Sequence, residues 1–304
     1  MSEPTLDTLT QRLDRLEREP KMFKSAVLGF LGLVLVTAGW ASIRVDNSVE
    51  LARTWEEARV FLPPRVLPPS GTHSYLLPLK PAKVPPQDHP LPTVLYLPGC
   101  TGFIPWYDGN WAETLTAAGY AVVMPTSFAR EYRPTNCDPA TQRAGWTPQV
   151  HAMRLQEIKY ALEQLRTLEW VDQRNLFLMG HNEGGIAAAR WSGNEFNGHI
   201  ISGWKCTHPE GWLSGVHAPR TTPVLAINHQ NDPWYLGPLD GSCAGRDNVR
   251  EIILPGSGHE TADSPEAREA LMQFLGEHTG LLVKSYPLPG KVIGRAPWIK
   301  NPFR

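Results

Sequence analysis

Apolar runs alternate with amphipathic stretches along residues 73–278. Four of the runs, TVLYL, YAVVM, NLFLM and PVLAI, are continuously apolar, as expected for strands that are buried on both faces. Between two of them, Val150, Ile158 and Leu162 recur at roughly helical spacing and would form a core-facing stripe. This alternation predicts βαβ units and therefore an α/β fold, with a mainly parallel sheet and helices on both of its faces.

The bounds of the expected elements follow from the apolar runs and the turn residues between them. The expected strands are His73–Leu79, Thr93–Leu97, Tyr120–Pro125, Asn175–Met179, His199–Ser202, Pro223–Asn228 and Glu251–Leu254. The expected helices are Asn47–Phe61, Asn110–Ala118, Gln149–Leu168, Glu183–Trp191 and Pro265–Glu277. Residues 279–304 are rich in proline, glycine and basic residues and are expected to be irregular.

A different pattern precedes this domain, because residues 25–43 carry no charge. At about 1.5 Å per residue, a helix of that length nearly crosses a hydrocarbon core of about 30 Å. Trp40 lies where an interfacial anchor is expected. More basic residues precede the segment than follow it closely, namely Arg12, Arg15, Arg18, Lys21 and Lys24 before it and Arg44 and Arg53 after it. The positive-inside rule then predicts a single-pass anchor in a bacterial-type inner membrane, with the amino terminus cytoplasmic and the main domain periplasmic.

The alternative is a signal peptide that is cleaved after Ala41, which would make the domain a secreted protein. The long and mixed-charge region over residues 1–24 favours the anchor. That region is expected to form a short cytoplasmic helix whose leucines make a seam suited to self-association, namely Leu6, Leu9, Leu13 and Leu16. Residues 44–72 are expected to form a stiff, proline-rich spacer between the membrane and the domain.

The amino-acid composition limits the kinds of binding partner and cofactor that we expect. The net charge of −1 and the pI near 6.8 give no electrostatic reason to expect nucleic acid. The four cysteines show no spacing typical of zinc, and we expect neither a metal nor a cofactor. An oxidising compartment would let the cysteines pair, and four cysteines allow three connectivities. We expect Cys100 with Cys137 and Cys206 with Cys243, because each pair would join loops on one rim of the sheet.

The sharpest chemical signal is the segment MGHNEGG at residues 179–185, which leads from an apolar strand into an alanine-rich helix. A nucleophile elbow requires this strand–turn–helix context, because its central residue sits in a strained turn. The glycines let neighbouring backbone pass close to that turn. The GxGxxG and Walker patterns of nucleotide sites are absent from the sequence. Asn182 occupies the central position of the predicted elbow.

Two further residues follow in the order that an α/β-hydrolase requires. Asp232 comes after the strand that ends at Asn228, and His259 comes after the strand that ends at Leu254. Since the carboxyl ends of parallel strands meet at one edge of a sheet, we expect both residues to converge on Asn182.

An oxyanion hole in this fold uses one N–H from the loop after the first core strand and one from the residue after the nucleophile. The loop is LPGCTG at residues 97–102. The expected donors are therefore near Cys100 or Thr101, and at Glu183.

Together these segments resemble the dienelactone-hydrolase-like branch of the α/β-hydrolases. The resemblance rests on LPGCTG, on GYAVVMPTSFAR followed by Arg133 and Cys137, and on GHNEGG, NDPW and PGSGH, and it extends from His73 to Glu277. It implies an α/β-hydrolase fold that acts on a small-molecule carboxylic ester or lactone. By position it assigns Asn182, Asp232 and His259 as nucleophile, acid and base. The elbow departs from the family, which has serine or cysteine where this chain has Asn182.

That departure bears directly on the chemistry. A serine hydroxyl becomes a nucleophile when histidine removes its proton, whereas an amide nitrogen is delocalised into its carbonyl. We therefore expect weak or atypical hydrolysis, in which Asn182 polarises a water for His259. The alternatives are a catalytically inactive pseudo-hydrolase that keeps the pocket for ligand binding or as a scaffold, and an inactivated variant of a normal enzyme.

Aromatic residues follow the predicted catalytic loops and are expected to line an apolar cleft, namely Trp106, Tyr107 and Trp234, with Trp212 in a covering segment over residues 205–220. Arg130 and Arg133 follow the strand that ends at Pro125. Their guanidinium groups are expected to pair with a substrate carboxylate.

Overall fold

The computed structural model describes residues 47–67, 77–78, 89–145, 147–208, 210–235 and 243–280. The predicted anchor over residues 25–43, the preceding helix with its leucine seam and the tail beyond residue 280 lie outside these ranges. Within the described ranges, no helix combines the length and the apolar character that crossing a bilayer requires. The chain divides into two units, residues 1–49 and 50–304, and the sheet belongs to the second.

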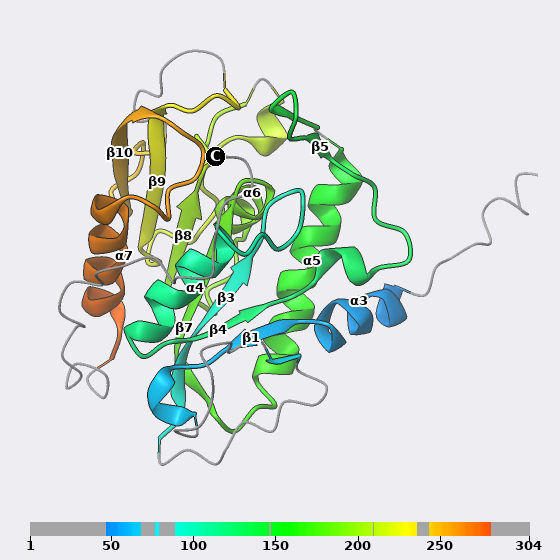
Figure 1. The fold of residues 1–304 in the computed structure, drawn as a ribbon, viewed down its shortest axis with the longest axis vertical. Coiled ribbons are helices and arrows are strands. Elements are labelled where there is room, and N and C mark those ends of the chain that lie inside the picture. Colours follow the sequence, from blue (N-terminus) through cyan, green and yellow to red (C-terminus); the bar gives the residue numbers. More distant parts are fainter. Residues whose placement is uncertain are drawn as a thin grey trace, which may run out of the picture. The chain divides into compact units, whose positions relative to one another are not determined.

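One sheet of eight strands organises this unit in the order β10-β9-β8-β7-β3-β4-β1-β2 (Figure 1). Its strands are β1 (Arg59–Phe61), β2 (Leu77–Pro78), β3 (Leu91–Leu97), β4 (Ala121–Met124), β7 (Val171–His181), β8 (Gly198–Ser202), β9 (Val224–Asn231) and β10 (Val249–Ser257). The helices are α3 (Asn47–Glu56), α4 (Asp108–Ala117), α5 (Pro148–Leu165), α6 (Glu183–Arg190) and α7 (Pro265–His278), with short 3-10 turns at Pro64–Val66, Ser127–Ala129 and Gly211–Leu213.

The strands β10, β9, β8, β7, β3 and β4 are parallel to their neighbours in this series, and at the edge β1 pairs antiparallel with both β4 and β2. This confirms the predicted α/β class with a mainly parallel sheet. Crossover helices explain the arrangement, because parallel neighbours need a long connection and the helices that provide it cover the faces of the sheet.

Alternation along β3 separates two hydrophobic cores. Leu95 and Leu97 point to the face that α5 and α6 cover, where they join Ile158 and Ile186. The intervening residue Tyr96 points to the opposite face, which α4 and α7 cover. All seven residues of β3 are buried, as a central strand with helices on both sides requires. Burial on both faces therefore fixes the register of the strand that ends at the oxyanion loop.

Two expectations for the segment before residue 73 are wrong. The predicted helix over Asn47–Phe61 ends at Glu56, and Arg59–Phe61 form β1, which pairs with β4. The buried side chain of Val60 explains the change, since it completes the core at the sheet edge. Residues 59–61 of the predicted spacer are thus part of the sheet, and the folded domain begins before residue 73.

Other boundaries differ by a few residues. The predicted helix Gln149–Leu168 is α5, which ends at Leu165, and the predicted strand Asn175–Met179 is longer, since β7 extends from Val171 to His181. A small hairpin of β5 (Cys137–Asp138) and β6 (Arg143–Ala144) was not predicted. Two-residue strands are too short to show an alternating pattern.

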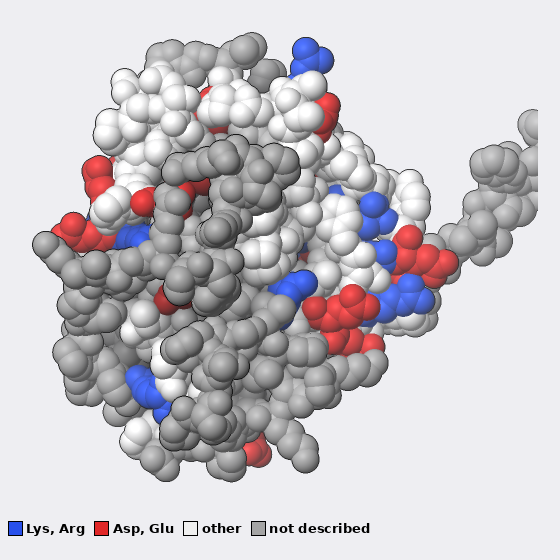
Figure 2. All heavy atoms as spheres, in the orientation of Figure 1, with Lys and Arg blue, Asp and Glu red and all other residues white. Residues whose placement is uncertain are grey.

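Two disulfides form, Cys100–Cys137 and Cys206–Cys243, which confirms the expected pairing. The first attaches the β5–β6 hairpin to the loop after β3. The surface carries mixed charge, since basic and acidic side chains lie interspersed around α3 on the face shown in Figure 2. This distribution agrees with the near-zero net charge of the sequence.

Candidate active site

The turn between β7 and α6 forms an elbow at Asn182. The φ angle of Asn182 is 55°, in the left-handed region, which asparagine tolerates better than most residues. The two flanking glycines are required by close backbone packing. A Cβ on Gly180 would overlap the carbonyl of Gly184, and a Cβ on Gly184 would overlap the carbonyl of Leu97. The elbow therefore holds the Asn182 side chain above the carboxyl end of the sheet.

Asn182, Asp232 and His259 converge at this point. Nδ1 of His259 lies 2.7 Å from Oδ2 of Asp232, and Nε2 of His259 lies 2.6 Å from Nδ2 of Asn182. Asp232 follows β9 directly and is buried, and a backbone N–H from Trp234 fixes its other oxygen at 2.9 Å. The structure thus brings together the three positions that the sequence placed at separate strand ends.

The hydrogen-bond partners also define the state of the imidazole. An amide nitrogen can only donate, so Nε2 of His259 accepts from Asn182 and carries no proton. Nδ1 then carries the proton and donates it to Asp232. His259 is therefore neutral, with its basic nitrogen aimed at the elbow side chain, as a general base must be.

The Asn182 side chain occupies the oxyanion hole. Its Oδ1 accepts backbone N–H bonds from Glu183 at 2.7 Å and from Cys100 at 3.3 Å. Two N–H donors on one oxygen settle which end of the carboxamide is the carbonyl. Of the two candidates in the loop after β3, Cys100 and not Thr101 donates. The hole is thus preformed, and the protein's own amide carbonyl lies where a substrate carbonyl would bind.

A cavity of about 690 Å³ opens onto Asn182 and His259. Three residues predicted for substrate contact line it, namely Trp106, Tyr107 and Trp234, together with the predicted oxyanion-loop residues Cys100 and Thr101. The Trp234 ring stacks on the His259 imidazole with centroids 5.0 Å apart, so an aromatic face covers the base. The cavity wall therefore combines apolar surface with a few polar groups, as small-molecule sites do.

Arg130 and Arg133 lie outside the lining of this cavity, as does Trp212. Buried carboxylates hold both arginines: Nε of Arg130 lies 2.9 Å from Glu157, and Arg133 forms a close ion pair with Glu183. Their placement gives no support to the predicted pairing with a substrate carboxylate. The sequence shows the arginines after a strand, but it does not show which acids face them.

Trp212 packs against the core of the domain. Its ring packs edge-on against His151, with centroids 5.6 Å apart, and rests on the core between the sheet and α5. The Arg190 guanidinium lies over the indole ring, 5.4 Å from its centroid. The 3-10 turn Gly211–Leu213 is therefore anchored by core packing.

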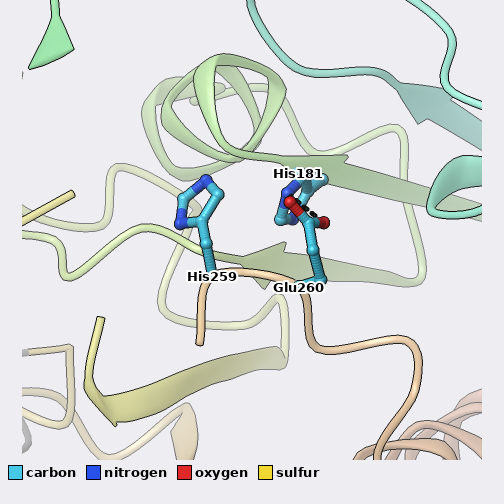
Figure 3. Close-up of side chains that lie close together, drawn as sticks. All are labelled: His181, His259 and Glu260. Atoms are coloured by element: carbon cyan, nitrogen blue, oxygen red, sulfur yellow. Dashed lines mark ion pairs between the residues drawn. The ribbon is translucent and has the colours of Figure 1, made fainter. Parts of the chain in front are cut away.

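Three ionisable residues of the cavity lining were not predicted: His181, Glu260 and Asp108. His181 and Glu260 form an ion pair of 3.1 Å beside His259 (Figure 3). Burial opposes the charged forms, but the pair outweighs it, raising the pKa of His181 and lowering that of Glu260. Both residues adjoin predicted catalytic positions, and that adjacency was the signal that would have found them.

The His181, Glu260 and His259 side chains offer donor atoms within 4.8 Å of one another, a spacing that could hold a metal ion. In this structure the groups are otherwise engaged. His181 pairs with Glu260 and Ser202, and both nitrogens of His259 have partners. The cluster thus acts as a charge pair beside the base.

Asp108 completes the polar wall. Its carboxyl accepts hydrogen bonds from the Tyr96 hydroxyl at 2.8 Å and from the Ile104 N–H at 2.6 Å. Burial raises the pKa of Asp108 to about 6. No pattern in the sequence distinguishes this aspartate from an ordinary helix-capping residue.

On these geometric grounds the sheet order, the elbow and the order of the converging residues define an α/β-hydrolase fold. No protein-family model matches the sequence, and no curated protein matches it. Solved structures do match. A protein described as a dienelactone hydrolase from Klebsiella pneumoniae is 15% identical, covering 66% of this chain and 90% of its own, with a TM-score of 0.47.

Two further matches are similar in extent. Est1E from Butyrivibrio proteoclasticus, with ferulic acid bound, is 13% identical, covering 73% of this chain and 94% of its own, with a TM-score of 0.48. A hyperthermophilic esterase from Pyrobaculum calidifontis is 17% identical, covering 66% of this chain and 80% of its own, with a TM-score of 0.43.

Proposed function

We propose that this protein is a hydrolase of a small-molecule carboxylic ester or lactone, with weak activity while Asn182 stands at the elbow. The observation that carries the proposal is the convergence of a neutral, Asp232-oriented His259 with two preformed oxyanion donors at one cavity. Those groups supply a general base and electrostatic stabilisation of a tetrahedral intermediate, which acyl transfer requires.

The nucleophile in this proposal is water. Asn182 has no hydroxyl or thiol to surrender a proton, whereas a water in the cavity can reach Nε2 of His259 once a substrate displaces the amide. Hydrolysis without a covalent acyl-enzyme loses the advantage of an activated nucleophile. Residual catalysis from the hole and binding alone reaches about 10³–10⁴ over water in triad enzymes that lack one member.

A second candidate is a pseudo-hydrolase that binds a ligand or serves as a scaffold. The observation in its favour is that Oδ1 of Asn182 fills the oxyanion hole. A substrate carbonyl must displace that oxygen before any chemistry begins. On this alternative the cavity with Trp106, Tyr107 and Trp234 binds without turnover.

The proposal also places the protein at a membrane. The uncharged residues 25–43 and the excess of basic residues before them support a single-pass anchor in a bacterial-type inner membrane with the domain in the periplasm. The two disulfides support an oxidising compartment.

Turnover of p-nitrophenyl esters by the purified full chain tests the function, with Asn182→Ser and His259→Ala alongside. Since removing a triad nucleophile costs on the order of 10⁶, we expect Asn182→Ser to raise kcat/KM by about 10³-fold or more. Asn194→Ser, the same change at an exposed position, is the matched control and should leave turnover unchanged.

The wild-type chain separates the two candidates. Native turnover that disappears in His259→Ala supports water-mediated hydrolysis. Turnover that appears only in Asn182→Ser supports the pseudo-hydrolase. If neither the wild type nor Asn182→Ser hydrolyses any ester or lactone tested, the proposal of an ester site is wrong.

A further inference from the structure

The geometry points to a reaction of this site on its own elbow: we propose that Asn182 is a self-modification site, whose side-chain amide is hydrolysed to aspartate by water with His259 as the proton carrier. This inference goes beyond ester hydrolysis, because it requires no external substrate. It rests on the position of one carboxamide between the oxyanion donors and the base.

The carboxamide of Asn182 is held as a bound amide substrate would be. Its carbonyl oxygen lies in the oxyanion hole, 2.7 Å from the Glu183 nitrogen and 3.3 Å from the Cys100 nitrogen. Its nitrogen, which would be the leaving group, lies 2.6 Å from Nε2 of His259. Amide hydrolysis needs a stabilised oxyanion and a group that protonates the leaving nitrogen, and Nε2 of His259 can serve as that group once it has taken a proton from water.

Water has access to this carboxamide. Asn182 and His259 both line the open cavity of about 690 Å³, and each keeps a small exposed fraction, 8% and 7%. The ion pair of His181 and Glu260 lies beside His259, with the two imidazole centroids 4.8 Å apart, and lines the same cavity (Figure 3). A polar wall of this kind can order a water next to the base.

The reaction balances without any further reagent. The water oxygen bonds to Cγ of Asn182 while Nε2 of His259 takes one water proton, and negative charge develops on Oδ1 inside the hole. The Cγ–Nδ2 bond then breaks, and His259 returns the proton to the departing nitrogen. Amide and water thus give ammonia and a carboxylic acid, which ionise to ammonium and carboxylate. Asp232 holds the other ring nitrogen throughout, at 2.7 Å, so the imidazole keeps its orientation.

The product would suit its surroundings. A carboxylate at position 182 would accept the same two N–H bonds, now charge-assisted, at the first turn of α6. Carboxylates form covalent intermediates in several hydrolytic mechanisms, whereas carboxamides do not. The conversion would therefore replace an unreactive elbow side chain with a nucleophile of a different class.

Peptide mass spectrometry after incubation in water enriched in heavy oxygen tests the proposal on the purified full chain. Trypsin releases residues 175–190 as one peptide, which contains both Asn182 and Asn175. Asn175 is buried and bonded to Asp172, so it serves as the internal control. We expect one heavy oxygen and the matching loss of ammonia at position 182, with Asn175 unchanged. A synthetic peptide with aspartate at position 182 supplies the reference spectrum.

Variants separate catalysis by the site from spontaneous deamidation. Because a positioned general acid–base contributes about 10²–10⁴-fold, His259→Gln should slow the conversion at least about 100-fold. His208→Gln, outside the cavity lining, should convert at the wild-type rate. Thermal unfolding of each variant verifies that the domain is folded before its rate is interpreted.

Three results would overturn the proposal: no label at position 182 in the wild type, equal rates in wild type and a folded His259→Gln, or a mixture of aspartate and isoaspartate. The mixture would indicate attack by the Glu183 backbone nitrogen instead of water. None of these outcomes depends on ester turnover, so failure here is distinguishable from failure of the proposed function.

Discussion

Glu157→Gln removes one negative charge from a buried ion network behind the oxyanion loop. Oε1 of Glu157 accepts from Arg130 at 2.9 Å, and Oε2 accepts from Arg154 at 2.9 Å. The Ser127 hydroxyl adds a third hydrogen bond at 2.8 Å. Glutamine keeps one acceptor oxygen but turns an amide donor toward a guanidinium. The variant therefore removes a carboxylate that neutralises two buried guanidinium groups, and Arg154 keeps the more distant contact of 3.6 Å with Glu183.

The expected magnitude follows from the burial of the pair. The side chains of Arg130, Arg154 and Glu157 are at most 2% exposed, so solvent screens their charges little. Removing one partner of a buried ion pair costs about 3–5 kcal/mol. That loss is a large part of the roughly 5–15 kcal/mol by which domains are stable. We expect the Tm to fall by about 6–20 °C, at about 2–4 °C per kcal/mol for a domain of this size.

Denaturant unfolding of the full chain under non-reducing conditions measures the change, which keeps both disulfides intact. Glu163→Gln is the matched control, because Glu163 is exposed on the same helix α5 and should change stability by no more than about 0.5 kcal/mol. A loss below about 1 kcal/mol for Glu157→Gln would refute the reasoning, since it would mean that water reaches the network.

Two further predictions concern pH and the elbow. Burial lowers the pKa of His199 to about 4 from its ordinary 6.5, so between these values the unfolded chain takes up a proton that the folded chain refuses. The free energy of unfolding should then fall as the pH drops from 6.5 toward 4. His199→Gln should make the free energy of unfolding depend less on pH in this range. An unchanged slope would contradict the conclusion that His199 is buried in its neutral form. Gly184→Ala should destabilise the fold by more than about 3 kcal/mol or prevent folding, because its Cβ would overlap the Leu97 carbonyl. Gly211→Ala should be tolerated, because a Cβ at that position has no atom within 4 Å. Equal unfolding midpoints for the two variants would contradict the packing argument.

The features that could be predicted from the sequence are those with a local signature. Strands buried on both faces appear as continuous apolar runs, and the elbow appears as glycines at fixed offsets around Asn182. Asp232 and His259 were found because each follows such a strand, and chain order is enough to place them at one edge of a parallel sheet. The fold class and the convergence of the site both depend on this regularity.

The parts that could not be predicted depend on pairings across long sequence distances. Arg133 and Glu183 are 50 residues apart, and nothing near Arg133 shows that an acid from the elbow helix faces it. The strand Arg59–Phe61 is too short to show alternation, and its conformation depends on pairing with β4 on one side and β2 on the other. The orientation of the Asn182 amide depends on one N–H group from the loop after β3 and one from the start of α6, and a residue pattern does not encode their meeting.

That orientation gives asparagine a second effect at the elbow, besides its lack of an ionisable hydroxyl. A substrate carbonyl can enter the hole only if Oδ1 of Asn182 leaves it and gives up the bonds from Cys100 and Glu183. At a net value of about 0.5–1.5 kcal/mol per hydrogen bond, this competition opposes productive binding by about 1–3 kcal/mol. It therefore weakens productive binding by roughly 5-fold to 150-fold, since about 1.4 kcal/mol is a factor of ten. Serine ends before it reaches those donors, so Asn182→Ser both restores a nucleophile and opens the hole. The gain in that variant is then expected in KM as well as in kcat, whereas a change confined to the nucleophile would appear in kcat alone.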